Sequence, residues 1–174
     1  VARVLGLPYP GGPSIDKLAK KGNDTYKLPL PLNDESYDFS FSGIKSAVIN
    51  LVNHEQQKGN ELRKEDLACS FQNRVVEILT KKTIKALKQY HVKNLIVAGG
   101  VAANSAIRKS LEEACIKNDV NLTVPPLLYC TDNAAMIGAA GFFAYQKGII
   151  ADLNLNAKAN CNLEDLLWEM WELL

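Results

Sequence analysis

The chain has 174 residues, of which 47% are hydrophobic and 22% are charged, and its formal net charge at pH 7 is +1. This composition is typical of one globular domain and excludes, by bulk charge, a strongly basic nucleic-acid surface or a charged membrane-binding surface. No apolar run approaches the roughly 20 residues that a membrane-spanning helix needs. The four cysteines lack C-x-x-C spacing, and three of them lie in apolar patterns that indicate buried thiols, which favours a reducing, cytoplasmic setting.

The first part of the chain alternates short helical patterns with proline-rich turns. Residues 1–7 predict a short helix, and a second helix is expected over residues 14–21. Residues 23–36 contain prolines and polar side chains and predict an exposed loop. Residues 38–41 alternate with period two, which is typical of a short strand.

Longer helical patterns follow, separated by short apolar runs. Strands that alternate with helices of this length predict an α/β layer structure. The apolar residues of the segment 162–174 fall on one face, which predicts an amphipathic helix in the tail. The other expected elements are, in chain order, helices 43–57 and 64–90, strand 93–98, helix 105–117, strand 121–124 and helix 132–147.

The segment Val97-Ala-Gly-Gly-Val-Ala-Ala-Asn104 places two glycines between a predicted strand and a predicted helix. Gly99 and Gly100 have no Cβ atom to keep a ligand away from the backbone. The free N–H groups of a helix N-terminus favour negative or polar ligand groups. A tight strand-to-helix turn would use the same glycines, so the local sequence leaves a nucleotide loop and a plain turn both open.

Three further motifs accompany this glycine segment. They are Tyr9-Pro-Gly-Gly-Pro-Ser-Ile-Asp16, Asp38-Phe-Ser-Phe-Ser-Gly-Ile-Lys45 and Cys130-Thr-Asp-Asn-Ala-Ala-Met-Ile137. In this order the four motifs resemble the TsaD/Gcp family of tRNA threonylcarbamoyladenosine transferases, formerly named O-sialoglycoprotein endopeptidases and grouped with the M22-like peptidases. The resemblance runs from Val1 to about Ala157. Because family members are about twice as long, the chain resembles their C-terminal half, and we expect it to be a fragment.

The resemblance implies an actin-like ATPase fold, in which two ribonuclease-H-like lobes close over a nucleotide. This chain would hold the second of the two lobes, in truncated form. We therefore expect residues 1–36 to be a linker and helix from the junction with the missing N-terminal lobe. Residues 37–150 would form the C-terminal ribonuclease-H-like lobe, and residues 151–174 a tail with an amphipathic helix.

Asn104 and Asp132 each stand at the start of a predicted helix, where two interpretations are open. An asparagine at this position caps the helix, and an aspartate is favoured by the helix dipole, although Thr131 could cap the second helix instead. The resemblance implies instead that Asn104 contacts the substrate and that Asp132 binds a metal ion.

A divalent ion requires three or more protein ligands, and one aspartate does not make a site. The two histidines of the chain, His54 and His91, have no other ligand nearby in the sequence and are interpreted as solvated surface residues. The resemblance implies one divalent ion, iron or zinc, per full-length subunit, with two histidines of the absent half completing the site. Asp132 would then be one part of an incomplete site.

Gly12 and Asp16 belong to the proline-rich motif near the start of the chain. From the residues alone, Gly12 serves the turn and Asp16 lies in the first turn of a helix, where an acidic residue is favourable. The resemblance implies that both contact the substrate, with the Asp16 carboxylate on a ribose or threonyl hydroxyl. Ser42 is expected to cap a helix, and Lys45 reaches either a phosphate or, as we favour, solvent.

Two motifs are missing from the sequence. It contains no Gly-x-Ser-x-Gly elbow, which argues against a serine hydrolase of the α/β type. It contains no His-Glu-x-x-His segment, which argues against the older peptidase assignment of the family.

The resemblance implies that the parent protein transfers the threonylcarbamoyl group from threonylcarbamoyl-AMP to the adenosine 3′ of the tRNA anticodon. It also implies TsaB-like and TsaE-like partner proteins, and an inactive fragment. The alternatives are a nucleotide-binding ATPase or scaffold of the actin and sugar-kinase type, and the older metalloendopeptidase. Apolar surface left bare by the missing lobe predicts a homodimer, and no membrane partner is expected.

Overall fold

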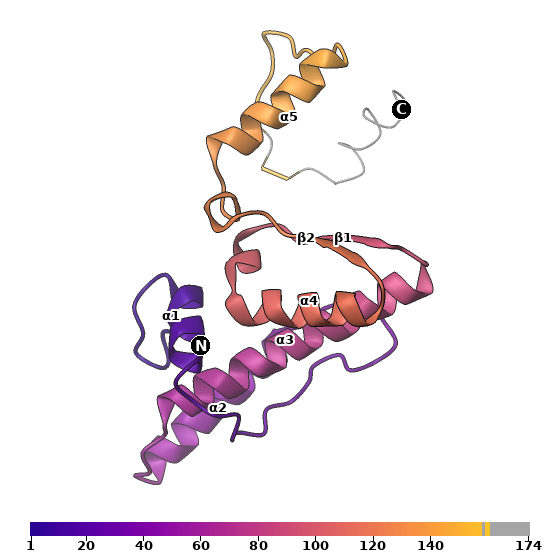
Figure 1. Cartoon of the computed structure of the whole chain (residues 1–174). Coiled ribbons are helices and arrows are strands. Elements are labelled where there is room, and N and C mark those ends of the chain that lie inside the picture. Colours follow the sequence, from indigo (N-terminus) through magenta and orange to yellow (C-terminus); the bar gives the residue numbers. More distant parts are fainter. Residues whose placement is uncertain (158, 161–174) are drawn as a thin grey trace. The chain divides into compact units, whose positions relative to one another are not determined.

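The computed structural model describes residues 1–157 and 159–160. The chain divides into two compact units, unit 1 (Val1–Thr131) and unit 2 (Asp132–Leu174), each of which is described by itself. Unit 1 contains helices α1 (Gly11–Ala19), α2 (Ser42–Gln57), α3 (Lys64–Gln89) and α4 (Ser105–Lys117), strands β1 (Asn94–Ile96) and β2 (Asn121–Thr123), and 3-10 helices η1 (Gly100–Ala103) and η2 (Leu127–Tyr129) (Figure 1). Unit 2 contains α5 (Ala134–Gln146).

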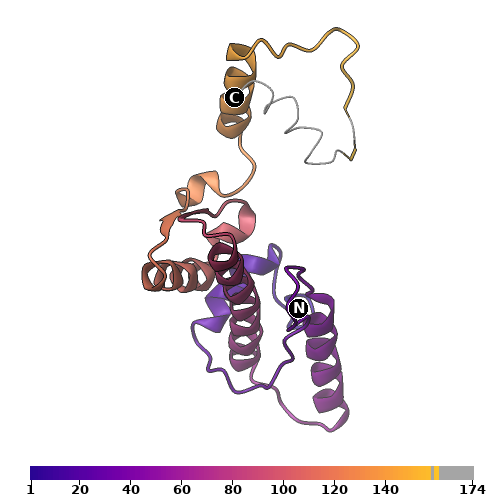
Figure 2. The same cartoon turned by 90° about the vertical axis from the view of Figure 1, so that its right-hand side faces the viewer.

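The long helix α3 organises unit 1, because α1, α2 and α4 all contact it (Figures 1 and 2). Apolar residues spaced four apart on α1 and α2 meet the first turns of α3 and form the core. Ile44 and Val48 of α2 and Leu67 of α3 are completely buried. Full burial of an aliphatic side chain of this size stabilises the folded state by about 1.5–3 kcal/mol.

Strands β1 and β2 form a parallel pair that is joined through η1 and α4. Asn94 pairs with Asn121 and Ile96 pairs with Thr123. This strand–helix–strand unit confirms the α/β prediction as a small parallel sheet, although both strands are shorter than expected. Parallel strands are usually covered on both faces, yet Ile96 is 75% exposed.

Two of the expected elements near the start of the chain are wrong. Residues 1–7 form a hydrogen-bonded turn instead of a helix, and the chain then turns away at Gly6, whose φ is +73°. Residues 38–41 form no strand, because no other described segment pairs with them. The alternating Phe39 and Phe41 stack on each other instead, with ring centroids 6.4 Å apart.

Helix α1 begins at Gly11, three residues earlier than predicted. Pro13 is accommodated because the N–H groups of the first helical turn have no partner within the helix. The other helices agree with the predicted ranges to within two residues at each end, and the tail helix predicted over 162–174 lies outside the described residues. The expected boundaries near residues 36 and 150 stay predictions.

The segment 23–36 is held against α3 by polar contacts. Asn23 N donates to Asp66 Oδ1 at 2.9 Å, and Tyr26 N donates to Ser70 Oγ at 3.0 Å. Most of the segment is exposed, as predicted, but Leu28 is buried in the core. This loop is therefore part of unit 1's packed structure.

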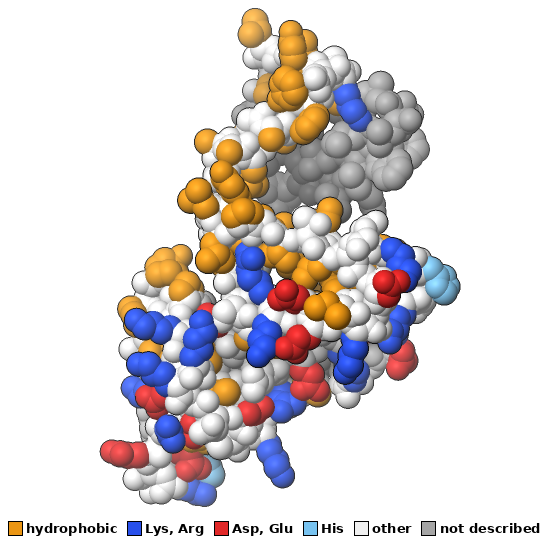
Figure 3. Space-filling model, viewed as in Figure 1, with side chains coloured by type: hydrophobic (Ala, Val, Ile, Leu, Met, Phe, Trp, Pro, Cys, Tyr) orange, Lys and Arg blue, Asp and Glu red, His pale blue; other side chains and the backbone are white. Residues whose placement is uncertain are grey.

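In unit 2, helix α5 carries no charged residue and is apolar on every side, yet none of its residues is buried. Figure 3 shows hydrophobic side chains gathered along α5, whereas the visible face of unit 1 mixes positive and negative side chains. None of the described helices combines the length and the apolar character that crossing a membrane requires.

Candidate functional site

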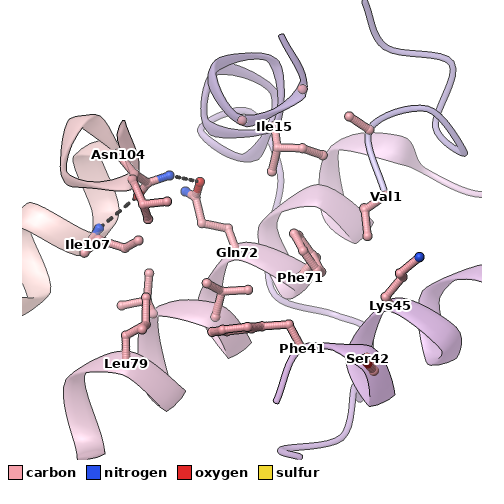
Figure 4. A pocket seen from close by; sticks show the side chains of 16 residues that line it. Val1, Ile15, Phe41, Ser42, Lys45, Phe71, Gln72, Leu79, Asn104 and Ile107 are labelled. Atoms are coloured by element: carbon pink, nitrogen blue, oxygen red, sulfur yellow. Dashed lines mark hydrogen bonds between the residues drawn. The ribbon is translucent and has the colours of Figure 1, made fainter. Parts of the chain in front are cut away.

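An open cleft of about 870 Å³ in unit 1 brings together segments that are distant in the sequence. Its walls come from the start of the chain, from α1, α2 and α3, and from the turn that leads into α4 (Figure 4). Most of the lining is aliphatic or aromatic. The glycines and polar residues of the lining are Gly11, Gly12, Ser42, Lys45, Gln72 and Asn104.

Asn104 is the N-cap of α4. Its Oδ1 accepts hydrogen bonds from Ala106 N at 3.0 Å and from Ile107 N at 2.9 Å. Its Nδ2 donates to Gln72 Oε1 of α3 at 2.9 Å, as Figure 4 shows. The cap interpretation is therefore confirmed. One amide N–H of Asn104 is left for a ligand, so capping and a ligand contact are compatible.

Asp16 lies in the second turn of α1, not in the first turn as expected, because α1 begins at Gly11. Its carboxylate accepts a hydrogen bond from Ser105 Oγ, at 2.9 and 3.0 Å to the two oxygens, and lies 3.3 Å from Lys20 Nζ. The helix dipole does not account for this position. Asp16 instead ties α1 to the first residue of α4, which places Gly12 and Asn104 on the same cleft.

The two glycines after β1 differ in conformation. Gly99 has φ +87° and ψ 171°, a region that essentially only glycine adopts. Gly100 begins η1, so the glycine pair leads into a 3-10 turn before α4 begins. A Cβ atom at Gly12, Gly99 or Gly100 would meet no atom within 4 Å. The backbone at these positions is therefore open to the approach of another group.

The expected cap at Ser42 is wrong. Ser42 is the first residue of α2, and the preceding residue, Phe41, makes no side-chain capping bond. Ser42 and Lys45 line the cleft on the side opposite Asn104 (Figure 4). Lys45 is exposed. Its ammonium group can therefore reach either solvent or a phosphate group in the cleft, and the structure does not favour one of these two interpretations.

Asp132 is exposed and stands in unit 2, one residue before the N-cap of α5. That cap is Asn133, whose side chain accepts from Met136 N at 2.9 Å. The expectation that Asp132 or Thr131 caps the helix is therefore wrong. Within the described residues no three histidine, cysteine, aspartate or glutamate side chains group as a metal site would require.

Arg108 was not anticipated from the sequence. Its Nε donates to Ala102 O of η1, and its Nη2 donates to Pro125 O at 2.8 Å and lies 3.0 Å from Cys130 Sγ. The arginine thus joins the turn after β1 to the segment that precedes Asp132. No sequence signal identifies it, because an arginine on a helix most often faces solvent.

Gln72 was also missed. It is a polar residue beside the apolar stripe of α3 and is 8% exposed. Buried polar side chains are usually hydrogen-bonded. That rule is the only signal that could have pointed to a partner such as Asn104.

Comparisons with known proteins agree with the motif analysis. A family model described as TsaD: tRNA N6-adenosine threonylcarbamoyltransferase matches residues 1–139. A relative from Staphylococcus epidermidis is 57% identical over 165 residues, which cover 94% of this chain and 48% of the relative. One from Staphylococcus aureus is 55% identical over 166 residues, which cover 95% and 49%. Both are named tRNA N6-adenosine threonylcarbamoyltransferase, and the chain spans about half the length of these curated relatives.

Proposed function

The chain belongs to the TsaD family, and we propose that the protein containing it transfers a threonylcarbamoyl group from threonylcarbamoyl-AMP to the adenosine 3′ of the tRNA anticodon. The curated relatives carry the name of this activity. The observation that supports a nucleotide-type substrate here is the meeting of Gly12 and Asn104 on one cleft. These residues come from two separate motifs that are distant in the sequence, one near the start of unit 1 and one just before α4.

The chemistry of the cleft suits an adenylate. Aliphatic and aromatic walls take up a flat base, and Gly12 leaves its backbone accessible to a sugar or phosphate. Lys45 supplies positive charge on the opposite side (Figure 4). Asn104 supplies an amide donor at the N-terminus of α4, where polar ligand groups are favoured. The chain's residues would bind and orient the acyl donor.

We propose that the chain forms one lobe of the actin-like, ribonuclease-H-like fold. The part of the relatives' sequence that this chain does not cover would form the other lobe. Two features of the described residues support this. The parallel sheet consists of only two strands, which is seldom stable without further strands or a covering layer. The cleft also remains open along its apolar walls.

Asp132 is proposed as one ligand of a divalent iron or zinc ion. Its exposed carboxylate has no hydrogen bond or ion pair within the described residues, so it is available as an oxygen ligand. Since these residues form no three-ligand group, the remaining ligands must come from elsewhere in the protein. Such an ion polarises acyl or phosphate oxygens when it is bound.

The test is acyl transfer by a protein that joins this sequence to the preceding half found in its relatives. It would be incubated with threonylcarbamoyl-AMP, tRNA and partner proteins of the TsaB and TsaE type, and modified adenosine would be measured. We expect transfer by the joined protein and none by the 174-residue chain. Nucleotide hydrolysis without transfer would instead favour the ATPase or scaffold alternative, and peptide cleavage the older endopeptidase assignment.

The metal role of Asp132 has a separate test. In the joined protein, Asp132→Asn should lower the bound metal content measured by elemental analysis. It should leave α5 unaffected, because Asn133 provides the cap. Unchanged metal content would contradict the proposed ligand role.

A further inference from the structure

The side-chain amides of Asn104 and Gln72 form a chain of hydrogen bonds, here called the relay, that begins at backbone N–H groups of α4. These backbone donors determine the direction in which each hydrogen bond of the relay points. Two backbone N–H groups of α4 donate to Asn104, so the atom facing them must be Oδ1. Nδ2 then faces Gln72, and the Gln72 atom 2.9 Å away must be the acceptor Oε1. The remaining atom of the Gln72 amide is therefore Nε2, which carries two N–H donors.

Nε2 of Gln72 has no hydrogen-bond partner among the residues that the structure describes, although more than nine-tenths of the residue is buried. Gln72 lines the cleft (Figure 4). Nε2 itself keeps contact with the solvent of the open cleft, since it is not among the fully buried polar atoms that lack a partner. A ligand that displaces this water must offer Nε2 an acceptor, because a donor that is buried without one is unfavourable. A ligand in the cleft would supply the missing acceptor.

The surroundings of Gln72 indicate what kind of acceptor this is. Its neighbours along the same wall include Val75, Val76 and Leu79, which are apolar. Lys45, the one charged side chain of the cleft lining, lies on the opposite side (Figure 4). An uncharged donor in an apolar wall suits a neutral acceptor, such as a ring nitrogen, better than a phosphate, which needs charged partners.

We propose that Gln72 is a specificity-determining residue that donates from Nε2 to a ring nitrogen of the adenine base of a nucleotide in the cleft. This inference rests on the proposed function, from which the adenylate is taken. The relay also makes the donor stronger, because each amide is polarised by the one before it, beginning at the N-terminus of α4.

The experiment measures binding of AMP and of adenosine by calorimetry, in the protein that joins this sequence to the preceding half of its relatives. Gln72→Met keeps the length of the side chain and removes both polar atoms. We expect it to weaken both ligands by a similar factor, about tenfold. A loss confined to AMP would overturn the proposal, because it would place the contact on the phosphate.

Gln72→Glu distinguishes the role of the amide oxygen, which accepts from Asn104, from the role of the amide nitrogen, which would donate to the base. A glutamate at position 72 retains an oxygen acceptor for Asn104 but, when ionised, has no donor for the base. At pH 8 we expect weaker binding of adenosine than in the wild type. Wild-type affinity would overturn the proposal, since it would leave Gln72 with no role beyond holding Asn104. Gln56→Glu, on an exposed site of α2, is the matched control and should bind as the wild type does.

Asn104→Asp provides an independent check. Aspartate also caps helices well, but it offers no donor to Gln72, so the Gln72 amide should turn over and present Oε1 to the base. The losses from Asn104→Asp and Gln72→Met should therefore be much less than additive for adenosine. Full additivity would contradict the relay.

The outcomes also distinguish this inference from the proposed function. A joined protein that transfers the acyl group to tRNA, while Gln72→Met binds adenosine normally, overturns only the role of Gln72. A protein whose adenosine binding depends on Gln72 but which transfers nothing to tRNA overturns only the proposed activity. A wild-type protein that binds neither AMP nor adenosine overturns the role of Gln72.

Discussion

Unit 1 and unit 2 contain similar kinds of apolar residue but use them differently. In unit 1, Ile44, Val48 and Leu67 are completely inaccessible to solvent. In unit 2, helix α5 is at least as apolar along its length, yet Ile137, Phe142 and Phe143 are more than half exposed. A helix that is apolar all round is normally found buried.

The difference shows that hydrophobicity alone does not make a core. Unit 1 has three helices whose apolar faces meet, and its polar loops are tied to α3. The described part of unit 2 has a single helix with nothing packed around it. We therefore infer that α5 is completed by a surface outside the described part of unit 2, such as the other half present in the relatives.

The largest predicted effect is a difference in the free energy of unfolding lost when an isoleucine is replaced by alanine in unit 1 and in unit 2. Ile44→Ala should destabilise unit 1 by about 2–5 kcal/mol, because it leaves a cavity in a packed core. Ile137→Ala should change the stability of this chain by no more than about 0.5 kcal/mol, because its side chain is 67% exposed. Urea unfolding followed by circular dichroism measures both. Equal costs would contradict the comparison, and a larger Ile137 cost in the joined protein would locate the missing partner surface.

Glycine substitutions should act with opposite sign in the two units. Gly99→Ala should cost about 1–3 kcal/mol, because Gly99 adopts φ +87°. Gly141→Ala should stabilise α5 by about 0.5–1 kcal/mol, because it replaces a glycine inside a helix and an added Cβ meets no atom within 4 Å. Gly100→Ala is the control beside Gly99. Thermal unfolding should show a lower midpoint only for Gly99→Ala.

The exposed side chains of α5 predict self-association of the chain, by burial of apolar surface between two copies. Light scattering over a concentration series should show a dimer mass at high concentration. Ile137→Lys should shift the dissociation constant upward by about tenfold, since it places a charge on the apolar surface. A monomer mass at every concentration would rule out the dimer, and would leave α5 exposed or covered within one chain.

The smallest predicted effect concerns charge in unit 1. Hydrogen bonds from Ser36 and from Lys82 hold the pKa of Asp34 at about 2, below its usual 3.8. A carboxyl group whose pKa is lower in the folded state than in the unfolded state stabilises the fold at pH values above its unfolded-state pKa. This stabilisation is lost as the pH falls through the folded-state pKa. The free energy of unfolding should therefore decrease as the pH falls from about 4 to about 2. In Asp34→Asn the free energy of unfolding should depend less steeply on pH over this range. Acid titration with chemical unfolding provides the measurement, and identical slopes would exclude the contribution of Asp34.

Much of the fold could be predicted from residue patterns because the pattern and the structure share a local cause. The apolar spacing of α3 and the polar residue before α4 indicate a long helix and a capped one, and both are present. Ile44 and Val48 are spaced four apart and become buried. Each of these predictions depends on neighbours within one helical turn.

The incorrect predictions depend on groups that are distant in the sequence. Residues 38–41 have the alternation of a strand, but a strand requires a partner segment, and Lys82 Nζ hydrogen-bonds Asp38 O instead. The sequence places Asp16 in a first helical turn, where the helix dipole favours an acidic residue, whereas in the structure Ser105 Oγ donates a hydrogen bond to it. No pattern within either segment contains this information.

By itself the sequence determined the order of the longer helices and of the two strands, the family and the motifs that carry its chemistry, because these depend on residue identity and local spacing. Only the tertiary structure decided that Gly12 and Asn104 share a cleft and that Gln72 faces that cleft with an unused donor. The physical reason is that hydrogen bonds and apolar contacts act over a few ångströms. Which distant residues come within that range is decided by how α1 and α4 pack on α3.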